Sequence, residues 1–172
     1  SAGATADAEN HTPMPSSSAS SSNVMVGHLR EEKSPRTLFE AAALLSQHPD
    51  IFIEHIGAEH DPALARLAHQ TAHNCPHYQF TGPLSYPRTR HQIQRAHVLV
   101  HTSVMEGGAH VLMEAMCSGV PVIASRIAGN LGMLGSDYAG LFPVGDAQAL
   151  ADKYGKDAEL MLYCRSGNRA GP

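Results

Sequence analysis

Short apolar runs alternate with helix-like segments through the middle of the chain. The runs with the composition of strands are Val24–Val26, Ile51–Ile56, Tyr78–Thr81, His97–Thr102 and Val120–Ala124. Between several of them, apolar residues recur at the three- and four-residue spacing of one helix face, as at Leu38, Ala41, Ala42 and Leu45. Strands that alternate with helices predict an α/β domain, with a Rossmann-like parallel sheet and helices on both of its faces.

Helix boundaries are marked by local signals. Ser34-Pro35 and Asp61-Pro62 each place a capping residue before a proline, which is the usual start of a helix. A weaker helical pattern covers about residues 88 to 95. Gly119 follows the helical pattern that contains Glu114 and is expected to end it.

The chain divides into three parts by composition. Residues 1–22 are rich in Ser, Ala, Pro and Thr and are expected to form a disordered tail or linker, because they cannot bury enough apolar surface to offset their ordering entropy. Residues 23–153 hold the alternating pattern and form the folded domain. Residues 154–172 lose the pattern and are expected to fray.

Two glutamates, Glu106 and Glu114, flank a glycine-rich turn between an apolar run and a helix-like run. A strand, a loop and a helix in that order present backbone N–H groups to a phosphate. An eight-residue step along a helix rises about 12 Å. A nucleotide sugar is of similar length between its sugar and its ribose, so one acid could bind each end.

Charged residues gather at one predicted edge of the sheet. In parallel sheets, ligands bind beyond the carboxyl ends of the strands. Arg30, Lys33, Glu106 and the loop 125–130 all follow predicted strands and therefore lie at those ends. Their convergence predicts one binding site.

Composition narrows the function further. The 172 residues suit one domain, and with 16% charged residues and a net charge of −4 there is no basic excess to attract nucleic acid or an anionic membrane surface. We expect no membrane span, because no apolar run is long enough, and we see no signal peptide. Three cysteines without repeated spacing do not suggest a disulfide framework, so we expect a cytoplasmic protein.

Twelve histidines raise the question of a metal site. His69 and His73 are four residues apart on a predicted helix, the spacing at which two imidazoles can bind one ion. No glutamate directly follows His69, as it would in a zinc protease motif, and no third ligand is evident in the sequence. We therefore predict no metal site.

The stretch from about Val26 to Asp146 resembles the C-terminal, donor-binding domain of a retaining GT-B glycosyltransferase of family 4. The resemblance rests on Gly27-His-Leu-Arg-Glu-Glu-Lys33, the spacing of Glu106 and Glu114, and Gly119-Val-Pro-Val-Ile123. Met105-Glu-Gly-Gly-Ala109, Ala124-Ser-Arg-Ile-Ala-Gly-Asn130 and Phe142-Pro-Val-Gly-Asp146 are similar to the selenosugar synthase subgroup of selenoneine biosynthesis. That likeness implies transfer of the sugar of UDP-N-acetylglucosamine to selenophosphate.

The resemblance implies a role for each matching residue. Glu106 would be the catalytic residue beside the transferred sugar, and Glu114 would accept hydrogen bonds from the ribose. The implied donor-binding residues are Arg30, Lys33, Gly107, Gly108, Ala109, His110, Val111, Glu114 and Asn130. Many members of the family place the arginine directly after the glycine, where this chain has His28. No cofactor or metal is implied, because basic side chains and helix dipoles do the work of a cation.

A complete GT-B enzyme also needs an N-terminal domain that binds the acceptor. We therefore expect this chain to be a fragment, which binds a nucleotide-sugar donor and needs the other domain, in cis or in trans, to transfer the sugar. Two alternatives remain: a non-catalytic nucleotide-sugar-binding module, and an enzyme similar to a sugar-nucleotide epimerase. A dehydrogenase is disfavoured, because no Gly-x-Gly-x-x-Gly follows the first strand.

Overall fold

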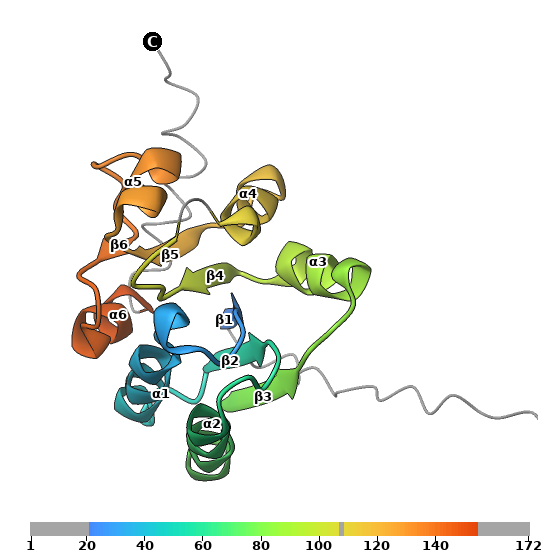
Figure 1. The fold of residues 1–172 in the computed structure, drawn as a ribbon. Helices are drawn as coiled ribbons and strands as arrows, with labels where there is room; N and C mark the ends of the chain where they lie inside the picture. The colour runs from blue at the N-terminus through green and yellow to red at the C-terminus, as the bar shows by residue number, and fades with distance from the viewer. Residues whose placement is uncertain (1–20, 107–108, 155–172) are drawn as a thin grey trace, which may run out of the picture.

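The computed structural model describes residues 21–106 and 109–154. Within them, six strands form one parallel sheet in the order β3-β2-β1-β4-β5-β6 (Figure 1). The strands are β1 (Ser21–Val26), β2 (Ile51–Ile56), β3 (Tyr78–Gly82), β4 (Val98–His101), β5 (Val122–Ser125) and β6 (Leu141–Phe142). The parallel α/β architecture predicted from the sequence is therefore confirmed.

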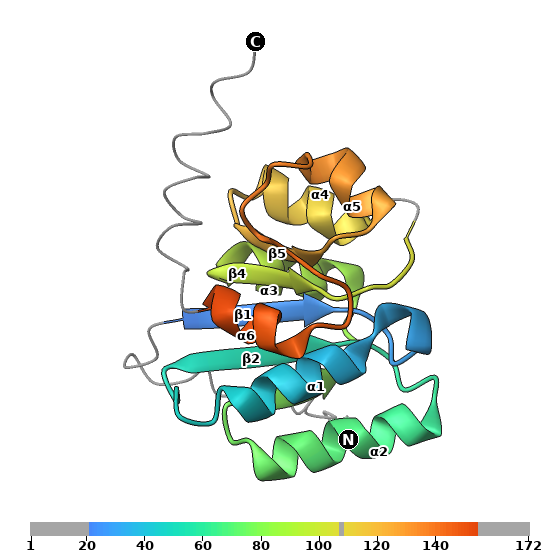
Figure 2. The same ribbon diagram turned by 90° about the vertical axis from the view of Figure 1, so that its left-hand side faces the viewer.

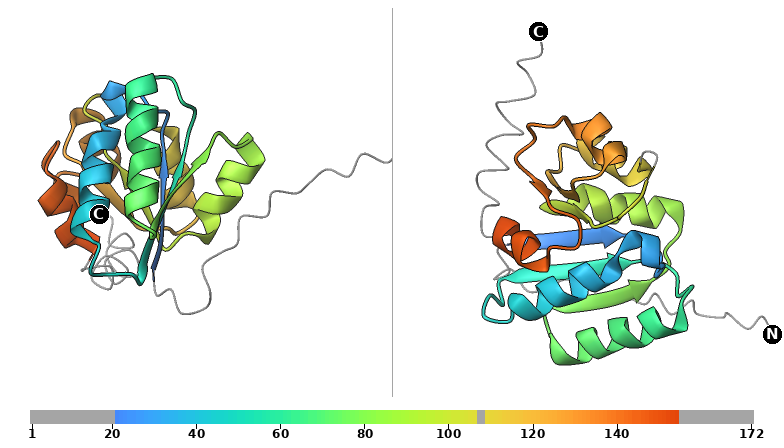
Figure 3. Two further views of the ribbon diagram at one scale, coloured as in Figure 1. Left: turned by 90° about the horizontal axis from the view of Figure 1, so that it is seen from below. Right: turned by 60° about the vertical axis from the view of Figure 1, so that its left-hand side comes forward.

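Helices cover both faces of this sheet. They are η1 (Glu31–Lys33), α1 (Pro35–Leu44), α2 (Pro62–Asn74), α3 (Tyr86–Arg95), α4 (His110–Cys117), α5 (Ala128–Leu134) and α6 (Ala147–Tyr154). In the left view of Figure 3, α1 and α2 lie on one side of the sheet and α3 lies on the other. Figure 2 shows β1, β2 and β4 pointing the same way, so the loops that follow them meet at one edge.

Two apolar clusters fill the space between the layers. Because successive side chains of a strand point to opposite faces, Met25 joins the cluster under α1, α2 and α6, while its neighbour Val24 joins the cluster under α3 and α4. Val98 and Val100 of β4 likewise face the first cluster, and Leu99 faces the second. Strands buried on both faces explain why the sequence shows continuous apolar runs there.

Strand β1 begins at Ser21, two residues before the predicted start of the domain at residue 23. Ser21 and Ser22 lie in β1, where they pair with Ile51 and Phe52 of β2. Polar side chains did not predict a strand, but the pairing uses the backbone, and the Ser21 N–H donates to the Asp50 carbonyl at 3.2 Å. At the other end α6 extends to Tyr154. The rest of the two expected tails, residues 1–20 and 155–172, lies outside the described residues.

The two predicted proline-containing helix starts are both confirmed, but only one of the two predicted side-chain caps is made. Asp61 caps α2, since its Oδ1 accepts from the N–H groups of Ala63 at 2.8 Å and Leu64 at 3.2 Å. Ser34 precedes α1 but does not cap it through its side chain. It has a left-handed backbone with φ of 47°, and its hydroxyl contacts that of Thr37 at 2.8 Å.

The segment 125–130 differs from the expected loop, because α5 begins at Ala128 within it. Gly129, Gly132 and Gly135 interrupt this region in the sequence, and glycines disfavour a helix. The helix nevertheless packs Leu131, Met133 and Leu134 against the second apolar cluster. Tertiary packing therefore outweighs the local preference. No helix in the described ranges is long and apolar enough to cross a membrane.

Candidate functional site

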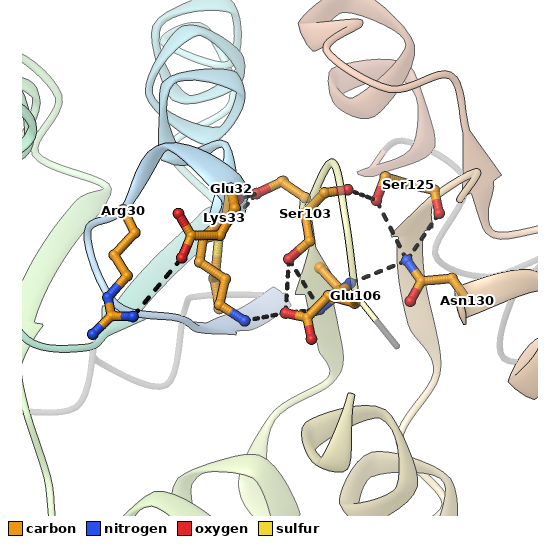
Figure 4. Close-up of polar contacts among 10 residues, drawn as sticks. Arg30, Glu32, Lys33, Ser103, Glu106, Ser125 and Asn130 are labelled. Atoms are coloured by element: carbon orange, nitrogen blue, oxygen red, sulfur yellow. Dashed lines mark hydrogen bonds and ion pairs between the residues drawn. The ribbon is translucent and has the colours of Figure 1, made fainter. Parts of the chain in front are cut away.

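An ion pair joins two loops at the carboxyl edge of the sheet. Lys33 ends η1, which follows β1, and Glu106 follows β4. The Lys33 ammonium donates to Oε1 of Glu106, and the two side chains are 26% and 14% exposed (Figure 4). Residues 73 positions apart in the chain thus meet at the place where the parallel topology predicts a site.

Hydrogen bonds to the backbone hold these two loops together. The Thr102 hydroxyl donates to the Lys33 carbonyl at 2.8 Å. The Val104 N–H donates to the Glu32 carbonyl at 2.9 Å. Because both bonds lie within a few residues of the ion pair, they fix the separation of the loops and leave the two charged side chains to face each other.

Glu106 is held in its ionised form. Burial alone would raise the pKa of this carboxyl group. The hydrogen bond and charge of Lys33, together with His101 and the Ser103 hydroxyl, outweigh burial and lower the pKa below the ordinary glutamate value. The site therefore presents a carboxylate at neutral pH.

Two adjoining hollows open beside this ion pair. The first, of about 220 Å³, is lined by the loop after β1, including Gly27, His28 and Lys33, and by Gly57. The second, of about 570 Å³, lies between α3 and α4 and includes His110 and Glu114. They share Val26, Leu84, Thr89 and Val111, so they form one continuous surface.

Glu114 is held at the wall of the second hollow by two side chains of α3. Its Oε1 accepts from the Tyr86 hydroxyl at 2.5 Å, and its Oε2 lies 3.2 Å from Nε of Arg90. The Glu114 side chain is 22% exposed. A carboxylate has about four lone-pair sites, so each oxygen keeps capacity for a further donor.

The structure brings most of the predicted site residues together. Lys33 contacts Glu106, and His110, Val111 and Glu114 line the second hollow. Ala109 immediately precedes α4 and is buried. Gly107 and Gly108 lie outside the described residues.

Arg30 and Asn130 lie elsewhere. The Arg30 side chain lines neither hollow and is half exposed. Its Nη1 lies 3.8 Å from Oε1 of Glu32 (Figure 4). Asn130 is fully buried, and its amide donates to the Ser125 carbonyl at 2.9 Å. Neither side chain faces the hollows, because η1 directs Arg30 outward and α5 directs Asn130 into the interior.

The helical distance inferred for the two glutamates needs correction. The α4 helix begins only at His110, so Glu106 lies in the preceding loop and the eight-residue step is only partly helical. Glu114 lines the second hollow, whereas Glu106 reaches the first through its contact with Lys33, which lines that hollow.

His28 is a site residue that the predictions omitted. It lines the first hollow beside Lys33. Its Nδ1 accepts from the Ala58 N–H at 2.9 Å, and its ring meets that of His60 edge to face, with centroids 4.8 Å apart. Burial, then His60, Arg30 and Lys33, lower the pKa of His28, which favours the neutral ring. Because Nδ1 accepts from Ala58, the neutral ring carries its proton on Nε2. Its place directly after Gly27 was the available signal.

His55 was also missed, because its role depends on two distant partners. It is fully buried in β2, and burial lowers its pKa to about 4. The neutral ring donates from Nε2 to the Gly27 carbonyl at 3.0 Å, so Nδ1 accepts from the Tyr78 hydroxyl at 2.9 Å. His55 thereby fixes the loop that lines the first hollow.

Solved structures with the same fold include two proteins named as sugar transferases and the protein TarM. A pneumococcal O-GlcNAc transferase, GtfA, in complex with UDP and GlcNAc has a TM-score of 0.61 at 19% identity, over 88% of this chain and 30% of that one. A mutant of TarM from S. aureus, in a complex containing UDP, has a TM-score of 0.68 at 20% identity, over 83% and 28%. The catalytic domain of a Helicobacter pylori cholesterol-α-glucosyltransferase has 0.66 at 22%, over 86% and 93%.

These likenesses show that the chain shares the α/β fold of those structures. Residues 17–156 match the family Glycosyl transferases group 1, and the chain belongs to that family. A curated relative, the D-inositol 3-phosphate glycosyltransferase of Corynebacterium urealyticum, is 31% identical over 141 residues. That match covers 76% of this chain and 33% of the relative, so the chain spans about a third of the relative's length.

Proposed function

We propose that this chain is the donor-binding domain of a retaining glycosyltransferase of family 4 and that it binds a UDP-sugar, with UDP-N-acetylglucosamine as the donor. The observation that carries the proposal is the continuous surface that runs from Lys33, which contacts Glu106, to Glu114. Membership of the glycosyltransferase group 1 family supports it.

The diphosphate would lie in the first hollow. A UDP leaving group gains negative charge as the glycosidic bond breaks, and a fixed cation stabilises that charge. Lys33 supplies this cation, and its ammonium has three N–H groups, so it can keep Glu106 and still donate to a phosphate oxygen. The proton on Nε2 of His28 offers a second donor in the same hollow.

The nucleoside would lie in the second hollow. Glu114 would accept from the two ribose hydroxyls, since an ionised carboxylate suits a vicinal diol. Tyr86 and Arg90 already hold the Glu114 carboxylate in one orientation. A fixed acceptor loses less conformational entropy on binding than a mobile one.

The sugar would lie against Glu106. Because this carboxylate stays ionised beside Lys33, it can accept from sugar hydroxyls and stabilise positive charge that develops at the anomeric carbon. Glu106 is therefore the residue to which we assign the catalytic role.

We further propose that transfer requires a second domain that binds the acceptor. The chain spans about a third of the length of its curated relative, which supports this division. Because its motifs resemble those of the selenosugar synthase subgroup, we propose selenophosphate as the acceptor. We also propose that the protein is cytoplasmic, as expected from its few cysteines without repeated spacing. No cofactor or metal enters this proposal.

Calorimetric titration of the 172-residue chain with UDP and UDP-N-acetylglucosamine tests the donor site. We expect both ligands to bind. Lys33→Ala should weaken both by about tenfold or more, because it removes a charge-assisted bond to the diphosphate. Glu114→Ala should weaken both to a similar extent through the ribose.

Arg30→Ala is the matched control, because Arg30 is also basic and close in sequence but lies outside both hollows. We expect less than about a twofold effect from it, as for a solvent-exposed pair. Equal losses from Arg30→Ala and Lys33→Ala, or no binding by the unaltered chain, would contradict the proposed site.

Analysis of the reaction products tests whether this chain takes part in glycosyl transfer. Turnover of UDP-N-acetylglucosamine with selenophosphate by this chain alone would contradict the need for a second domain. Conversion of the sugar nucleotide without any acceptor would instead indicate an epimerase-like enzyme. Binding without turnover, followed by transfer when the acceptor domain is added, is the expected result.

A further inference from the structure

We propose that Asn130, His101 and Ser103 form a directional hydrogen-bond relay that positions the carboxylate of Glu106. The relay explains why a predicted donor-binding residue, Asn130, lies in the interior behind the site. The proposal rests on the proposed function where it assigns Glu106 to the sugar, but the relay itself is defined by contacts within this chain.

The contacts form an unbroken series. Nδ2 of Asn130 lies 3.1 Å from Nδ1 of His101, and Nε2 of His101 lies 3.3 Å from the Ser103 hydroxyl. The Ser103 hydroxyl donates to Oε1 of Glu106 at 3.1 Å. Figure 4 shows Asn130 and Ser125 on one side of Glu106 and Lys33 on the other.

Hydrogen-bonding chemistry fixes the direction of each step. An ionised Glu106 only accepts, so the Ser103 proton points to it, and the Ser103 oxygen is left to accept from Nε2–H of His101. A neutral imidazole with its proton on Nε2 accepts at Nδ1, which requires a donor there. Asn130 presents its Nδ2 as that donor.

The orientation of the Asn130 amide has independent support. The same Nδ2 donates to the Ser125 carbonyl at 2.9 Å, and a carbonyl cannot donate, so the amide cannot be reversed. The Ser125 hydroxyl in turn donates to the Ser103 carbonyl at 2.5 Å, which connects the two ends of the relay. Asn130, His101 and Ser103 are each at most 4% exposed.

Burial keeps His101 neutral within this arrangement. It lowers the pKa of His101 to about 4, Glu106 opposes that shift, and Lys33 reinforces it. These are the charged groups on β1–η1 and on the β4–α4 loop that act on the ring. A neutral ring at physiological pH can serve as both acceptor and donor, as the relay requires.

The relay and Lys33 converge on one oxygen of Glu106. Lys33, the Ser103 hydroxyl and Nε2 of His101, the last at 3.6 Å, all approach Oε1. Among the described residues this leaves Oε2 as the oxygen for a sugar hydroxyl. Asn130, His101 and Ser103 are therefore positioning residues, because each acts through Glu106.

The first test examines the relay in the absence of a sugar nucleotide. Two-dimensional ¹H–¹⁵N NMR of the histidine rings should show His101 neutral at pH 7 with its proton on Nε2. Asn130→Ala removes the donor to Nδ1, and the spectrum should then show mixed tautomers. A proton on Nδ1 in the unaltered chain, or a tautomer that Asn130→Ala leaves unchanged, would overturn the relay.

The second test measures the effect of the relay on binding of the sugar part of the donor. In Ser103→Ala and His101→Leu, the ratio of the Kd for UDP to the Kd for UDP-N-acetylglucosamine should fall about three- to tenfold, with the affinity for UDP itself nearly unchanged. His101→Gln keeps an N–H near the position of Nε2 and should restore the ratio to within about twofold. Thermal unfolding confirms that each variant is folded.

His73→Gln, an exposed histidine at the end of α2, is the matched control and should change neither affinity. Equal loss of UDP and UDP-sugar affinity in Ser103→Ala and His101→Leu would show a structural role and overturn the proposal. Failure of His101→Gln to restore the ratio would do the same. If the unaltered chain binds neither ligand, the proposed function fails, and the NMR result alone decides whether the relay exists.

Discussion

In three histidines of this chain, a contact at one ring nitrogen determines which nitrogen carries the proton. His28, His55 and His101 each have one ring nitrogen bound to a neighbour, which determines what the other nitrogen can do. His28 accepts from a backbone N–H at Nδ1 and lines the first hollow, so its Nε2–H remains available as a donor. A lysine at the same position would bring a second mobile charge close to Lys33 and lose this fixed geometry.

Replacement of His28 tests this role. His28→Ala removes a donor from the first hollow and should weaken UDP binding by about three- to tenfold, as expected for a hydrogen bond to a charged group. His60→Ala keeps that donor and removes the edge-to-face ring contact together with the effect of His60 on the pKa of His28. Calorimetry should show a smaller effect for His60→Ala, and an equal effect would exclude a direct role for His28.

Single residues also show how far sequence reasoning reaches. Lys33, Glu106 and Glu114 were identifiable because each stands at a fixed place relative to a strand or a glycine. His101 and Ser103 were not, because the role that we propose for them depends on Asn130, which lies 29 positions from His101 in the chain. Nothing local distinguishes Arg30 from Lys33 either; the three residues of η1 decide which of them turns toward Glu106.

At the scale of elements, the close approach of the loops after β1 and β2 shapes the first hollow. A Cβ atom built on Gly57 would lie 2.1 Å from the Gly27 carbonyl oxygen, far inside van der Waals contact. That oxygen also accepts from His55. Only glycine at position 57 lets these two loops pack in this register.

Gly57→Ala should therefore destabilise the protein by about 1–3 kcal/mol, the usual cost of forcing extra atoms into a packed region. Gly132→Ala is the control, because Gly132 lies exposed in α5 with no atom within 4 Å of the added Cβ. It should be neutral or stabilising by up to about 1 kcal/mol. Urea denaturation of both variants measures the difference, and a destabilised Gly132→Ala with an unaffected Gly57→Ala would refute the argument.

The strands and helices that could be predicted best from the sequence are those with the most buried apolar residues. Strands β2 and β4 are apolar runs with few alternatives, and the sequence placed both to within one residue. The first residues of β1 are serines that pair only through the backbone, and β6 has two residues, too few for a pattern. Helix α5 depends on contacts with distant apolar residues, which no local signal records.

At the scale of the whole molecule, buried histidines connect stability to pH. Burial lowers the pKa of both His55 and His101 to about 4, whereas each ring in the unfolded chain would titrate near the ordinary histidine pKa of 6.5. The unfolded chain therefore binds protons first as pH falls. Their contribution to stability is complete above about pH 6.5 and is lost progressively down to about pH 4.

The free energy of unfolding should consequently fall by about 1.4 kcal/mol per pH unit for each histidine within this window. Denaturation at pH 7.5, 6 and 5 measures the slope. His55→Gln should reduce it, whereas the exposed His73→Gln should not. A slope that is the same in both variants would place the titrating group elsewhere.

The strand order has a consequence for how binding and folding are connected. Residues 21–82 build β3, β2 and β1, and residues 98–142 build β4, β5 and β6, so the sheet consists of two contiguous halves that meet between β1 and β4. Lys33 belongs to the first half, and Glu106 and Glu114 belong to the second. A donor that contacts all three spans the seam, and its binding energy adds directly to the energy that keeps the halves from separating.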